Sequence, residues 1–509
     1  MRVLIRCDGG GDQGVGHVIR SLALAEEAMD RGHDVLVAGH FEGAFVERQL
    51  NASAARVLPL PPHRRVDGVD SPLPLLASHP ADVLHLDHYE VGEELAAGLR
   101  DGLPGGTLLS NMEDGEFGRR PAHVVIDPTW GSEEAPRTPD GSRWLLRGAG
   151  YAAMRHQVTR LRGHTPDHPE AAASVLVLMG GTDPVGLAPL VVRALGGTGL
   201  SLAVTVIATG SNASAARDAA AGAPHLRVSV IPPVDDVATL MSEHHLVVSA
   251  AGTSVWEMCC IGVPMALVCA VPNQQDGYGR VVAAGAAVGL GGPEALSDTA
   301  GTAGRLASVL LDGALRRRLT GVASGIVDGL GAWRVVQTWE QAVAAGLPPA
   351  APPAAWVARV ATMEDARTLW TWRNDPVTRA SSRTSDEVPW ESHLTWLEAA
   401  LARTDRVILL VRDGSGDDVG TVRWDEQIPG QWEVSITVAV ERRGQSLARP
   451  LLACGEEHLR RTRNVTAYLA VVHQDNEPSR RLFTGSDYLP DLPADAGGFM
   501  RFRKPAPVA

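Results

Sequence analysis

Short apolar runs alternate with segments of helical periodicity along residues 1–345. The runs are continuous in valine, leucine and isoleucine instead of alternating with polar residues, which is typical of strands buried on both faces of a parallel sheet. The predicted strands cover residues 2–6, 34–38, 82–86, 107–110, 123–126, 174–179, 202–208, 226–230, 246–249 and 265–269. Helical patterns such as 17–32 and 253–262 lie between them, so the sequence predicts an α/β, doubly wound architecture.

Two glycine-rich loops divide this part of the chain. CDGGGDQGVGHVIRS (7–21) follows the first apolar run, and MGGTDPVG (179–186) follows a later one. We therefore predict two Rossmann-like halves, 1–155 and 156–345, the second closed by a helix at 331–346. Two such halves that face each other form a cleft, and α/β sheets bind their ligands there, beyond the strand ends.

A proline- and alanine-rich segment, GLPPAAPPAA (346–355), separates residues 1–345 from residues 356–509. Such a composition is semi-rigid and holds no core, so we predict a linker there. The second part mixes helical and extended patterns, which predicts an α+β domain. Its predicted helices cover 363–372, 391–403, 447–462 and 476–484, and its predicted strands cover 406–412, 418–424, 431–440 and 465–472.

Composition narrows the class of protein. The formal net charge is −13 at pH 7, and a chain of this sign is repelled by phosphate polymers, so we expect no nucleic-acid partner. The five cysteines lack the spacing of a disulfide framework or a structural zinc site, and we expect no metal. No apolar run reaches 18 residues and no leader pattern precedes the first strand, so we expect a cytoplasmic protein without a membrane partner. The oligomeric state stays open.

The first glycine-rich loop carries one histidine, His17, directly after Gly16 at the expected start of a helix. Gly9, Gly11 and Gly14 match the GxGxxG pattern of dinucleotide sites, but the helix is expected to begin only after Gly16, which disfavours NAD. The helix dipole disfavours a cationic histidine at that position, and a neutral imidazole can take a proton from water as a general base does. A capping or packing histidine is the alternative interpretation.

Several motifs follow one another along this part of the chain. They are RCDGGGDQGVGHVIRSLALA near the start, then LDHYEVG (86–92), GAGYAAMR (148–155), LMGGTDPVG (178–186), SAAGTSVWEMCCIGVPMALV (249–268) and PNQ (272–274). Together they resemble the nucleotide-sugar hydrolases of pseudaminic acid synthesis, which are GT-B-fold relatives of the glycosyltransferase that makes peptidoglycan lipid II. The resemblance implies that His17 activates water for attack at the anomeric carbon and that Tyr89 lies near the reacting sugar. Asp87 and His88 are expected either to orient Tyr89 or to be solvated.

The same resemblance implies where the nucleotide binds. Cleavage of a sugar–diphosphate bond needs a base for water and donors for the leaving group, and backbone amides of glycine loops provide such donors. In AGTSVWE (251–257), Ser254 and amides near Gly252 and Thr253 are implied to hold the diphosphate and Glu257 to accept the ribose hydroxyls; an ordinary helix cap is the alternative. The other residues expected to bind the nucleotide sugar are Gly14, Gly16, Gly180, Gly181, Asn273 and Gln274.

In the second part, ERRGQSLARPLLACGEEHL (441–459) resembles the acetyl-CoA loop of the GNAT superfamily. WRNDPVTR (372–379), ESHLTW (391–396) and NEPSRRLF (476–483) resemble further GNAT segments, and the resemblance covers about 356–505. The loop enters a helix whose first amides can bind the pyrophosphate of coenzyme A. The resemblance implies that acetyl-CoA is a co-substrate, bound by Arg443, Gly444, Ser446, Ala448 and Asn476.

Two residues depart from the GNAT pattern, because Ser446 stands where glycine is usual and Phe483 stands where a tyrosine often returns a proton to the thiolate. Water or Tyr488 is then expected to return it. Glu433, on the strand that leads into the loop, is the expected base, because an amine is cationic near neutral pH and attacks only after deprotonation. A solvated strand glutamate is the alternative for Glu433, and His393 is a second candidate base.

The sequence therefore predicts a GT-B-like pair of Rossmann-like domains followed by an α+β GNAT domain, in one bifunctional enzyme. The first part is expected to hydrolyse a nucleotide-linked amino-deoxy sugar, with UDP as the expected nucleotide and CMP still open. The second part is expected to N-acetylate an amino sugar of the same pathway with acetyl-CoA. One alternative is a GT-B glycosyltransferase fused to an acetyltransferase, in which a hydroxyl acceptor replaces water. The other is a non-catalytic nucleotide-sugar sensor.

Overall fold

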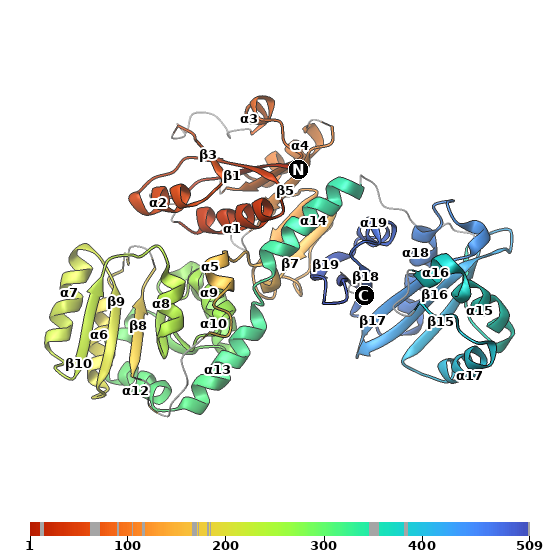
Figure 1. The fold of residues 1–509 in the computed structure, drawn as a ribbon. Helices are drawn as coiled ribbons and strands as arrows, with labels where there is room; N and C mark the ends of the chain where they lie inside the picture. Colours follow the sequence, from red (N-terminus) through yellow and green to blue (C-terminus); the bar gives the residue numbers. More distant parts are fainter. Residues whose placement is uncertain are drawn as a thin grey trace. The chain divides into compact units, whose positions relative to one another are not determined.

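The structure, a computed structural model, divides into two compact units, Met1–Val336 and Gln337–Ala509, which Figure 1 draws in sequence colours. These parts are called unit 1 and unit 2 below. The structure describes residues 1–10, 15–61, 72–88, 91–103, 105–113, 118–164, 171, 173–180, 183, 185–345, 356–380 and 385–506.

Unit 1 contains two sheets, and the first is a seven-stranded parallel sheet in the order β3-β2-β1-β4-β5-β6-β7. Its strands are β1 (Arg2–Cys7), β2 (Asp34–Gly39), β3 (Arg56–Pro59), β4 (Val83–Asp87), β5 (Leu108–Met112), β6 (Val124–Asp127) and β7 (Trp144–Arg147). Its helices are α1 (Gly16–Asp30), α2 (Ala44–Ala52), α3 (Leu73–Ser78) and α4 (Glu93–Gly102). Because β2 and β4 flank β1 on opposite sides, the strand order reverses at β1. Open α/β sheets bind ligands at such a switch point.

The second sheet of unit 1 is a six-stranded parallel sheet in the order β10-β9-β8-β11-β12-β13. Its strands are β8 (Ser174–Leu178), β9 (Leu202–Ile207), β10 (Leu226–Ile231), β11 (Leu246–Ala250), β12 (Met265–Val268) and β13 (Val288–Gly291). Its helices are α5 (His156–Thr159), α6 (Ala188–Gly197), α7 (Gly210–Ala221), α8 (Val237–Glu243), α9 (Ser254–Ile261), α10 (Gln275–Ala283), α11 (Pro293–Ser297), α12 (Thr299–Leu310) and α13 (Gly313–Ile326). Here the strand order reverses at β8, which β9 and β11 flank.

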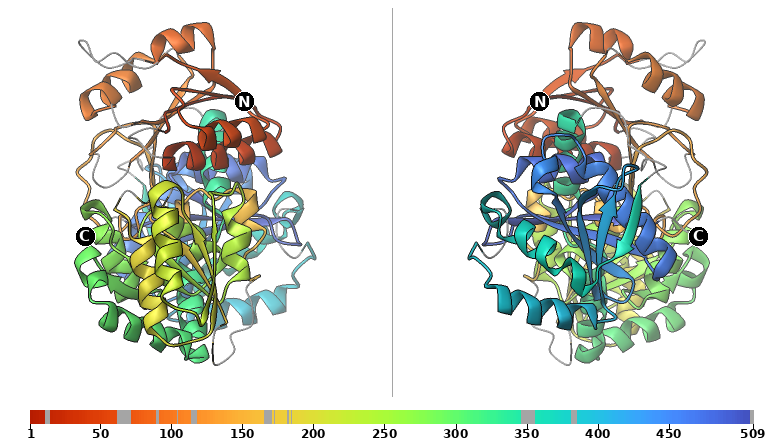
Figure 2. Two further views of the ribbon diagram at one scale, coloured as in Figure 1. Left: turned by 90° about the vertical axis from the view of Figure 1, so that its left-hand side faces the viewer. Right: turned by 90° about the vertical axis from the view of Figure 1, so that its right-hand side faces the viewer.

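Both faces of the central strands are covered, as their continuous apolar runs predict. In β8, Val175 and Val177 belong to a core that includes Leu306 of α12, whereas Leu176 between them belongs to a core that includes Met258 of α9. The two views of Figure 2 show helices on both sides of the parallel strands. The doubly wound arrangement predicted from the sequence is therefore confirmed in both sheets.

Unit 2 contains a seven-stranded mixed sheet in the order β14-β15-β16-β17-β18-β20-β19, which agrees with the predicted α+β class. Its strands are β14 (Val357–Val360), β15 (Arg406–Arg412), β16 (Asp418–Ile428), β17 (Gln431–Val438), β18 (Ala467–His473), β19 (Leu489–Leu492) and β20 (Phe499–Pro505). Its helices are α15 (Ala366–Asn374), α16 (Pro376–Ala380), α17 (Trp390–Leu401), α18 (Ala448–Thr462) and α19 (Glu477–Gly485).

The two central strands of this sheet, β17 and β18, are parallel and pair over a short stretch that ends at Val434 and Ala470. Beyond that point β17 pairs with β16 as far as Val438, while β18 pairs with β20 as far as His473. The two strands therefore separate toward their carboxyl ends. This separation exposes backbone groups of both strands to whatever molecule lies between them.

Helix α14 (Gly331–Ala345) contains the division between the two units. In unit 1, Arg334 donates a hydrogen bond to the carbonyl of Gly150 at 2.6 Å. In unit 2, the Thr484 hydroxyl donates to the Gln341 side-chain oxygen at 2.8 Å. The predicted linker, 346–355, lies outside the described residues, and the predicted domain boundary beside it stays a prediction.

Candidate functional site

In the first sheet, polar residues gather where β1 and β4 end, at the switch point. His17 is the second residue of α1, which begins at Gly16, one residue earlier than predicted. Its Nδ1 lies 2.6 Å from Oδ1 of Asp87, the last residue of β4. His17 is 4% exposed and Asp87 is fully buried. A carboxylate on Nδ1 fixes the tautomer with the proton on that nitrogen, so that Nε2 carries the lone pair that can accept a proton.

Arg20, one turn further along α1, binds the same carboxylate. Its Nε donates to Asp87 Oδ2 and its Nη2 donates to Asp87 Oδ1, both at 2.6 Å. Burial by itself would raise the pKa of Asp87, but the positive charges of Arg20 and His17 and their hydrogen bonds hold it well below its usual range. Asp87 is therefore ionised at neutral pH, and it can stabilise an imidazolium at His17.

Asp8 and His88 form a second buried pair beside the first. Nε2 of His88 lies 2.5 Å from Oδ2 of Asp8, and Arg6 binds the same carboxylate. The backbone amide of His40 donates to Asp8 Oδ1 at 2.7 Å. Because Asp87 and His88 are both buried in these pairs, the expectation that they are solvated is wrong. Tyr89, which they were expected to orient, lies outside the described residues, and so does Gly14.

The loop after β11 faces the first glycine-rich loop. A Cβ placed on Gly16 would lie 3.4 Å from the Thr253 side chain, so the backbone beside His17 lies against this loop. A Cβ on Gly252 would lie 3.7 Å from Nε2 of Gln274, whose Oε1 accepts a hydrogen bond from the Ala270 amide at 2.9 Å. Thus residues beside His17, Thr253 and Gln274, which are far apart in the sequence, lie close together, and their roles in binding stay predictions.

Helix α9 begins at Ser254 in this loop. Its N-cap residue, Thr253, makes no side-chain capping bond, which does not support the alternative of an ordinary helix cap. Glu257 lies one turn into α9 and is half-buried. Burial raises the pKa of Glu257, and the positive charge of Arg155 opposes that rise. A carboxylate that burial has partly removed from water is stabilised by hydrogen bonds from hydroxyl groups such as those of a ribose.

Two further predicted nucleotide-binding residues, Gly180 and Asn273, lie near the carboxyl ends of the second sheet. Gly180 follows β8 with a φ of 76°, a conformation that favours glycine, while Gly181 lies outside the described residues. Asp183, in the same loop, accepts hydrogen bonds from the amides of Leu187 and Ala188 and so caps α6. Asn273 is exposed in the 3₁₀ turn Pro272–Gln274.

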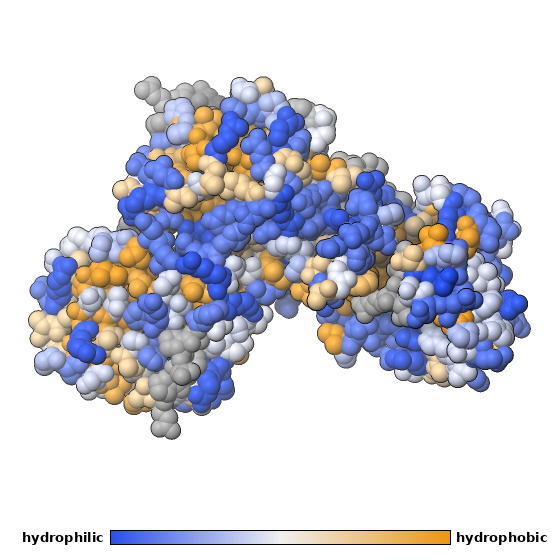
Figure 3. Space-filling model, in the orientation of Figure 1, coloured by the Kyte–Doolittle hydropathy of each residue, from blue (hydrophilic) through white to orange (hydrophobic). Residues whose placement is uncertain are grey.

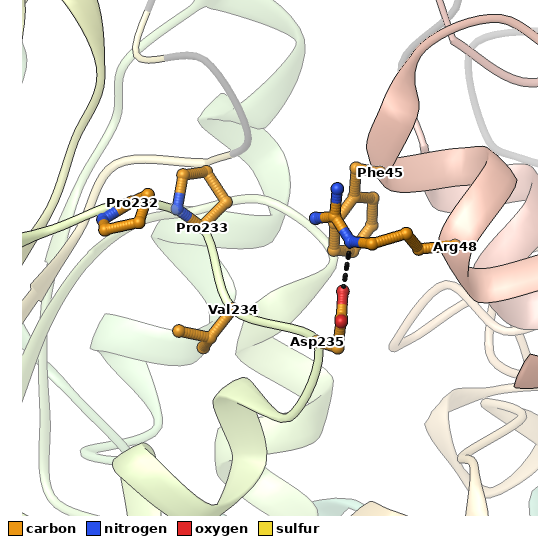
Figure 4. A pocket seen from close by; sticks show the side chains of 6 residues that line it. All are labelled: Phe45, Arg48, Pro232, Pro233, Val234 and Asp235. Atoms are coloured by element: carbon orange, nitrogen blue, oxygen red, sulfur yellow. Dashed lines mark hydrogen bonds and ion pairs between the residues drawn. The ribbon is translucent and has the colours of Figure 1, made fainter.

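A separate hollow of about 620 Å³ lies in unit 1 between α2 and the segment after β10 (Figure 4). Phe45 and Arg48 face Pro232–Asp235 across it. Arg48 Nε donates to Asp235 Oδ1 at 3.0 Å, and Gln49 donates to the same oxygen at 3.2 Å. The exposed ion pair contributes only about 0–1 kcal/mol, and none of the predicted site residues lines this hollow.

In unit 2, the loop after β17 leads into α18. Gly444 and Ser446 both have a positive φ, 77° and 57°. This conformation costs a residue with a Cβ roughly 1–2 kcal/mol, which explains why glycine is usual where Ser446 stands. The N-cap residue of α18, Leu447, makes no side-chain bond, so the amides from Ala448 onward begin a helix that can bind an anion.

Two predicted acetyl-CoA residues have side chains engaged within unit 2. Arg443 donates to Asp375 and to the Thr378 hydroxyl, each at 2.7 Å, and so ties the loop to the ends of α15 and α16. Asn476 caps α19 by accepting a hydrogen bond from the Ser479 amide at 3.1 Å. Contacts of Arg443 and Asn476 with coenzyme A therefore stay predictions.

Tyr488 is fully buried beside Phe483, with the two ring centroids 5.0 Å apart. Burial and the adjacent Glu456 carboxylate raise the pKa of Tyr488 well above its usual value. A hydroxyl enclosed in this core cannot exchange a proton with bound substrate or solvent. The suggestion that Tyr488 replaces the missing tyrosine is therefore wrong, and water is left for that role.

The two candidate bases of unit 2 lie on the same face of its sheet. Glu433 is paired in register with Asp425, and Ser435, two residues further, points to the same side of β17. His393 of α17 packs over this face and is 3% exposed. Its Nε2 donates to the carbonyl of Ala366 at 3.0 Å, and burial lowers the pKa of His393. Glu433 is half-buried, and both its role as the base and the alternative of a solvated strand glutamate stay predictions.

The described part of the chain has no cluster of metal-ligating side chains and no helix that could span a membrane. No three His, Cys, Asp or Glu side chains there are grouped as metal ligands would be. No described helix is long and apolar enough to cross a bilayer. Hydrophilic side chains cover most of the face drawn in Figure 3, with hydrophobic ones interspersed.

Comparisons with known proteins concern the fold and the family of each part. Residues 357–486 match the family model described as acetyltransferase (GNAT) domain. The spore coat polysaccharide biosynthesis protein SpsG of Bacillus subtilis (strain 168) is 24% identical over 339 residues, which cover 66% of this chain and 96% of SpsG. MurG of Acinetobacter baumannii is 17% identical and matches 67% of this chain and 99% of its own, with a TM-score of 0.50.

A further solved structure, spermidine N-acetyltransferase of Vibrio cholerae in complex with CoA and spermine, is 15% identical and covers 30% of this chain and 96% of its own, with a TM-score of 0.28. The likeness to MurG concerns the fold. The predicted fold class is thereby confirmed: two parallel Rossmann-like sheets in a GT-B arrangement, followed by a mixed-sheet GNAT domain. The first part is also similar to SpsG, a protein of polysaccharide biosynthesis.

Proposed function

We propose that the chain is a bifunctional enzyme of amino-sugar metabolism. Unit 1 hydrolyses a nucleotide-linked amino-deoxy sugar, with UDP as the expected nucleotide, and unit 2 N-acetylates an amino sugar of the same pathway with acetyl-CoA. The observation that carries the first activity is the buried Asp87–His17 pair at the switch point of the first sheet. The likeness to SpsG supports a role in the synthesis of sugar polymers.

In the hydrolysis, His17 Nε2 accepts a proton from water, while the Nδ1–H group keeps its hydrogen bond to the Asp87 carboxylate. The water oxygen forms a bond to the anomeric carbon, and the bond from that carbon to the diphosphate oxygen breaks. Amides around Gly252 and Thr253 bind the departing diphosphate, and Glu257 accepts the ribose hydroxyls. The products are a free sugar and the nucleoside diphosphate.

For the acetyl transfer, the separated ends of β17 and β18 and the loop into α18 support a site for acetyl-CoA. The amides from Gly444 to Ala448 bind the pyrophosphate. Glu433 takes the proton from the acceptor ammonium, the amine nitrogen then attacks the thioester carbonyl, and the carbon–sulfur bond breaks. The nitrogen loses its second proton as the amide forms, and this proton passes through water to the thiolate, which leaves as coenzyme A.

The test is to incubate the full chain with a panel of nucleotide-linked amino sugars, with and without acetyl-CoA, and to identify products by mass. We expect free reducing sugar and nucleoside diphosphate without acetyl-CoA, and a mass gain of one acetyl group with it. Sugar found only on an added hydroxyl acceptor contradicts hydrolysis and indicates a glycosyltransferase. Tight binding of the nucleotide sugars without turnover indicates a sensor.

A further inference from the structure

The glycine-rich segment 8–17, called the His17 loop below, is held at both ends by consecutive residues of β4 and its end. Asp87 binds His17 at the far end of the loop, where α1 begins. His88 binds Asp8 at the near end, directly after β1. Because β1 and β4 are paired in register to their last residues, the residues that follow them, Asp8 and His88, lie at one level. The end of β4 therefore binds the loop at both of its ends.

The pair at the near end of the loop is a buried ionic group. Nε2 of His88 lies 2.5 Å from Oδ2 of Asp8, and each side chain is 4% exposed. Arg6 donates to both carboxylate oxygens of Asp8. Burial by itself would raise the pKa of Asp8, but hydrogen bonds from His88 and Arg6 hold it well below its usual range. Asp8 is therefore ionised at neutral pH, and loss of a partner leaves part of a buried charge uncompensated.

The start of the loop is also fixed against the segment that follows β2. The amide of His40 donates to Asp8 Oδ1 at 2.7 Å, and the amide of Gly9 donates to the His40 carbonyl at 3.0 Å. The amide of Glu42 donates to the Gly9 carbonyl at 2.9 Å. At Gly10, φ is 98° and a Cβ would lie 1.9 Å from the Glu42 carbonyl oxygen, so only glycine fits there. The chain thus leaves β1 along one defined path.

This arrangement bears on the hydrolysis proposed for unit 1, and the inference drawn from it rests on that function. A general base acts only when its nitrogen is within hydrogen-bond reach of the attacking water, and a misplacement of about 1 Å can cost about 10²-fold in rate. The His17 loop contains five glycines, which give a loop more conformational freedom than other residues do. Fixing its first residue therefore restricts the positions that His17 can take.

We propose that Asp8 and His88 form a clamp that holds the start of the His17 loop on β4, so that His17 stays aligned with Asp87 and with the water that it activates. Neither member of the clamp touches the reacting atoms in this account, so both are positioning residues. The clamp acts on kcat of hydrolysis. It leaves UDP affinity unchanged, because the expected diphosphate and ribose contacts come from the loop after β11.

The test uses two substitutions of His88 in the full chain that differ in reach. His88→Gln places an amide N–H near the position of Nε2 and can still donate to Asp8, whereas the shorter side chain of His88→Asn cannot reach the carboxylate. His244→Asn is the matched control, because the buried ring of His244 also binds two groups, the Leu240 carbonyl and the Thr205 hydroxyl. His244 precedes β11, so it lies at the amino edge of its sheet, opposite the candidate site.

We expect His88→Asn to lower kcat of nucleotide-sugar hydrolysis by about tenfold or more, with UDP affinity by calorimetry unchanged. His88→Gln should stay within about threefold of the original kcat, and the His244→Asn control within about twofold. Thermal unfolding shows which variants are folded at the assay temperature. If His88→Asn is not folded, His88→Phe takes its place with the same expectations, because it fills the space of the ring without a donor.

A second measurement does not depend on turnover. The Nδ1–H proton of His17, in its short hydrogen bond to Asp87, gives a proton NMR signal downfield of the backbone amides, which is assigned by its loss in His17→Ala. We expect this signal to shift or broaden in His88→Asn and to be kept in His88→Gln and in the His244→Asn control.

Equal losses of kcat in His88→Asn and His88→Gln, a loss of UDP affinity that parallels the loss of kcat, or an unchanged His17 signal in folded His88→Asn overturns the clamp and leaves the hydrolase function standing. If the original chain hydrolyses no nucleotide sugar, the proposed function of unit 1 fails. The His17 signal then still decides whether the clamp holds this residue in place.

Discussion

Each unit places a buried histidine in its candidate site, but the two histidines have different partners. His17 in unit 1 is held through Nδ1 by the ionised carboxylate of Asp87. His393 in unit 2 is held through Nε2 by the carbonyl of Ala366. A carboxylate stabilises the imidazolium that forms when the ring accepts a proton, whereas a carbonyl in an apolar setting compensates that charge poorly.

The different hydrogen-bond partners of the two histidines indicate different roles for them. In the proposed hydrolysis, His17 takes up a proton and holds it during the reaction. His393, whose pKa is lowered by burial, stays neutral and lines a hollow of unit 2 between Trp390 and Trp396. The base of unit 2 is then better assigned to Glu433, a carboxylate on the same face.

The largest effect is expected from His17→Ala. Loss of the general base should lower kcat for nucleotide-sugar hydrolysis by about 10²–10⁴ while UDP affinity is kept. Steady-state kinetics and calorimetry with UDP measure the two quantities. His164→Ala is the control, because His164 is exposed outside the site. A variant that retains more than half of the original kcat contradicts the role of His17.

Asp87→Asn should lower kcat of hydrolysis by about 10², because an amide carries no charge and can favour the wrong tautomer of His17. Asp87 acts through His17 in this account, so the double variant with His17→Ala should be no slower than His17→Ala alone. An additive loss in the double variant would show that Asp87 works independently, for instance through Arg20 and the stability of α1. Thermal unfolding of each variant checks that the fold is kept.

Glu257→Ala should weaken UDP binding by about 2 kcal/mol, roughly thirtyfold, because charge-assisted hydrogen bonds to the ribose are lost. Calorimetry measures the change, with Glu243→Ala on the exposed end of α8 as the control. The kcat of hydrolysis should change far less than in His17→Ala. Unchanged affinity in a folded variant refutes the assignment.

In unit 2, Glu433→Gln should lower kcat of amine acetylation by about tenfold or more, whereas His393→Asn should change it by less than about threefold. Raising the pH should partly restore the Glu433→Gln variant, because more of the amine is then deprotonated without a base. The pH profile of each variant is the measurement. A larger loss of kcat in His393→Asn than in Glu433→Gln contradicts the assignment of Glu433. It would indicate that His393 acts as a base, as His17 is proposed to do.

The smallest effect concerns the stability of unit 2. Because the folded pKa of His393 lies below its unfolded value of about 6.5, the unfolded chain binds more protons as the pH falls below that value. Stability should therefore decrease from pH 7 toward pH 5, and His393→Asn should flatten this slope. Urea unfolding at several pH values measures it. An equal slope in the variant would show that His393 is not the group responsible.

All but one of the strands that the sequence missed lie at the edges of their sheets. β3, β7, β13, β14 and β19 are edge strands of their sheets. An edge strand is short and covered on fewer sides, so it lacks the continuous apolar run that marks a central strand. β13, with the sequence VGLG, shows this clearly. The interior strand β20 was also missed, although MRFR (500–503) alternates apolar and basic residues in the period of two that predicts a strand.

The site residues that lie within a sequence motif could be predicted. Those that only the packing of the fold brings together could be predicted less well. His17 and the loop 252–257 follow from glycine patterns beside strand ends and from resemblance. The pairing of Asp87 with His17 does not, because nothing in one sequence says that β4 lies next to β1. A usable signal was present, since Asp87 ends a buried apolar run, as Cys7 and Asp8 do. The clamp at the start of the His17 loop depends on the same two neighbouring strands.

The central claim is that His17 directs water to the anomeric carbon, and isotope labelling tests it most directly. Hydrolysis of the nucleotide sugar is carried out in water enriched in ¹⁸O, and both products are analysed by mass. If water attacks the anomeric carbon, the label enters the released sugar and the nucleoside diphosphate stays unlabelled. Label in a phosphate of the nucleotide, with none in the sugar, shows attack at phosphorus and contradicts the account.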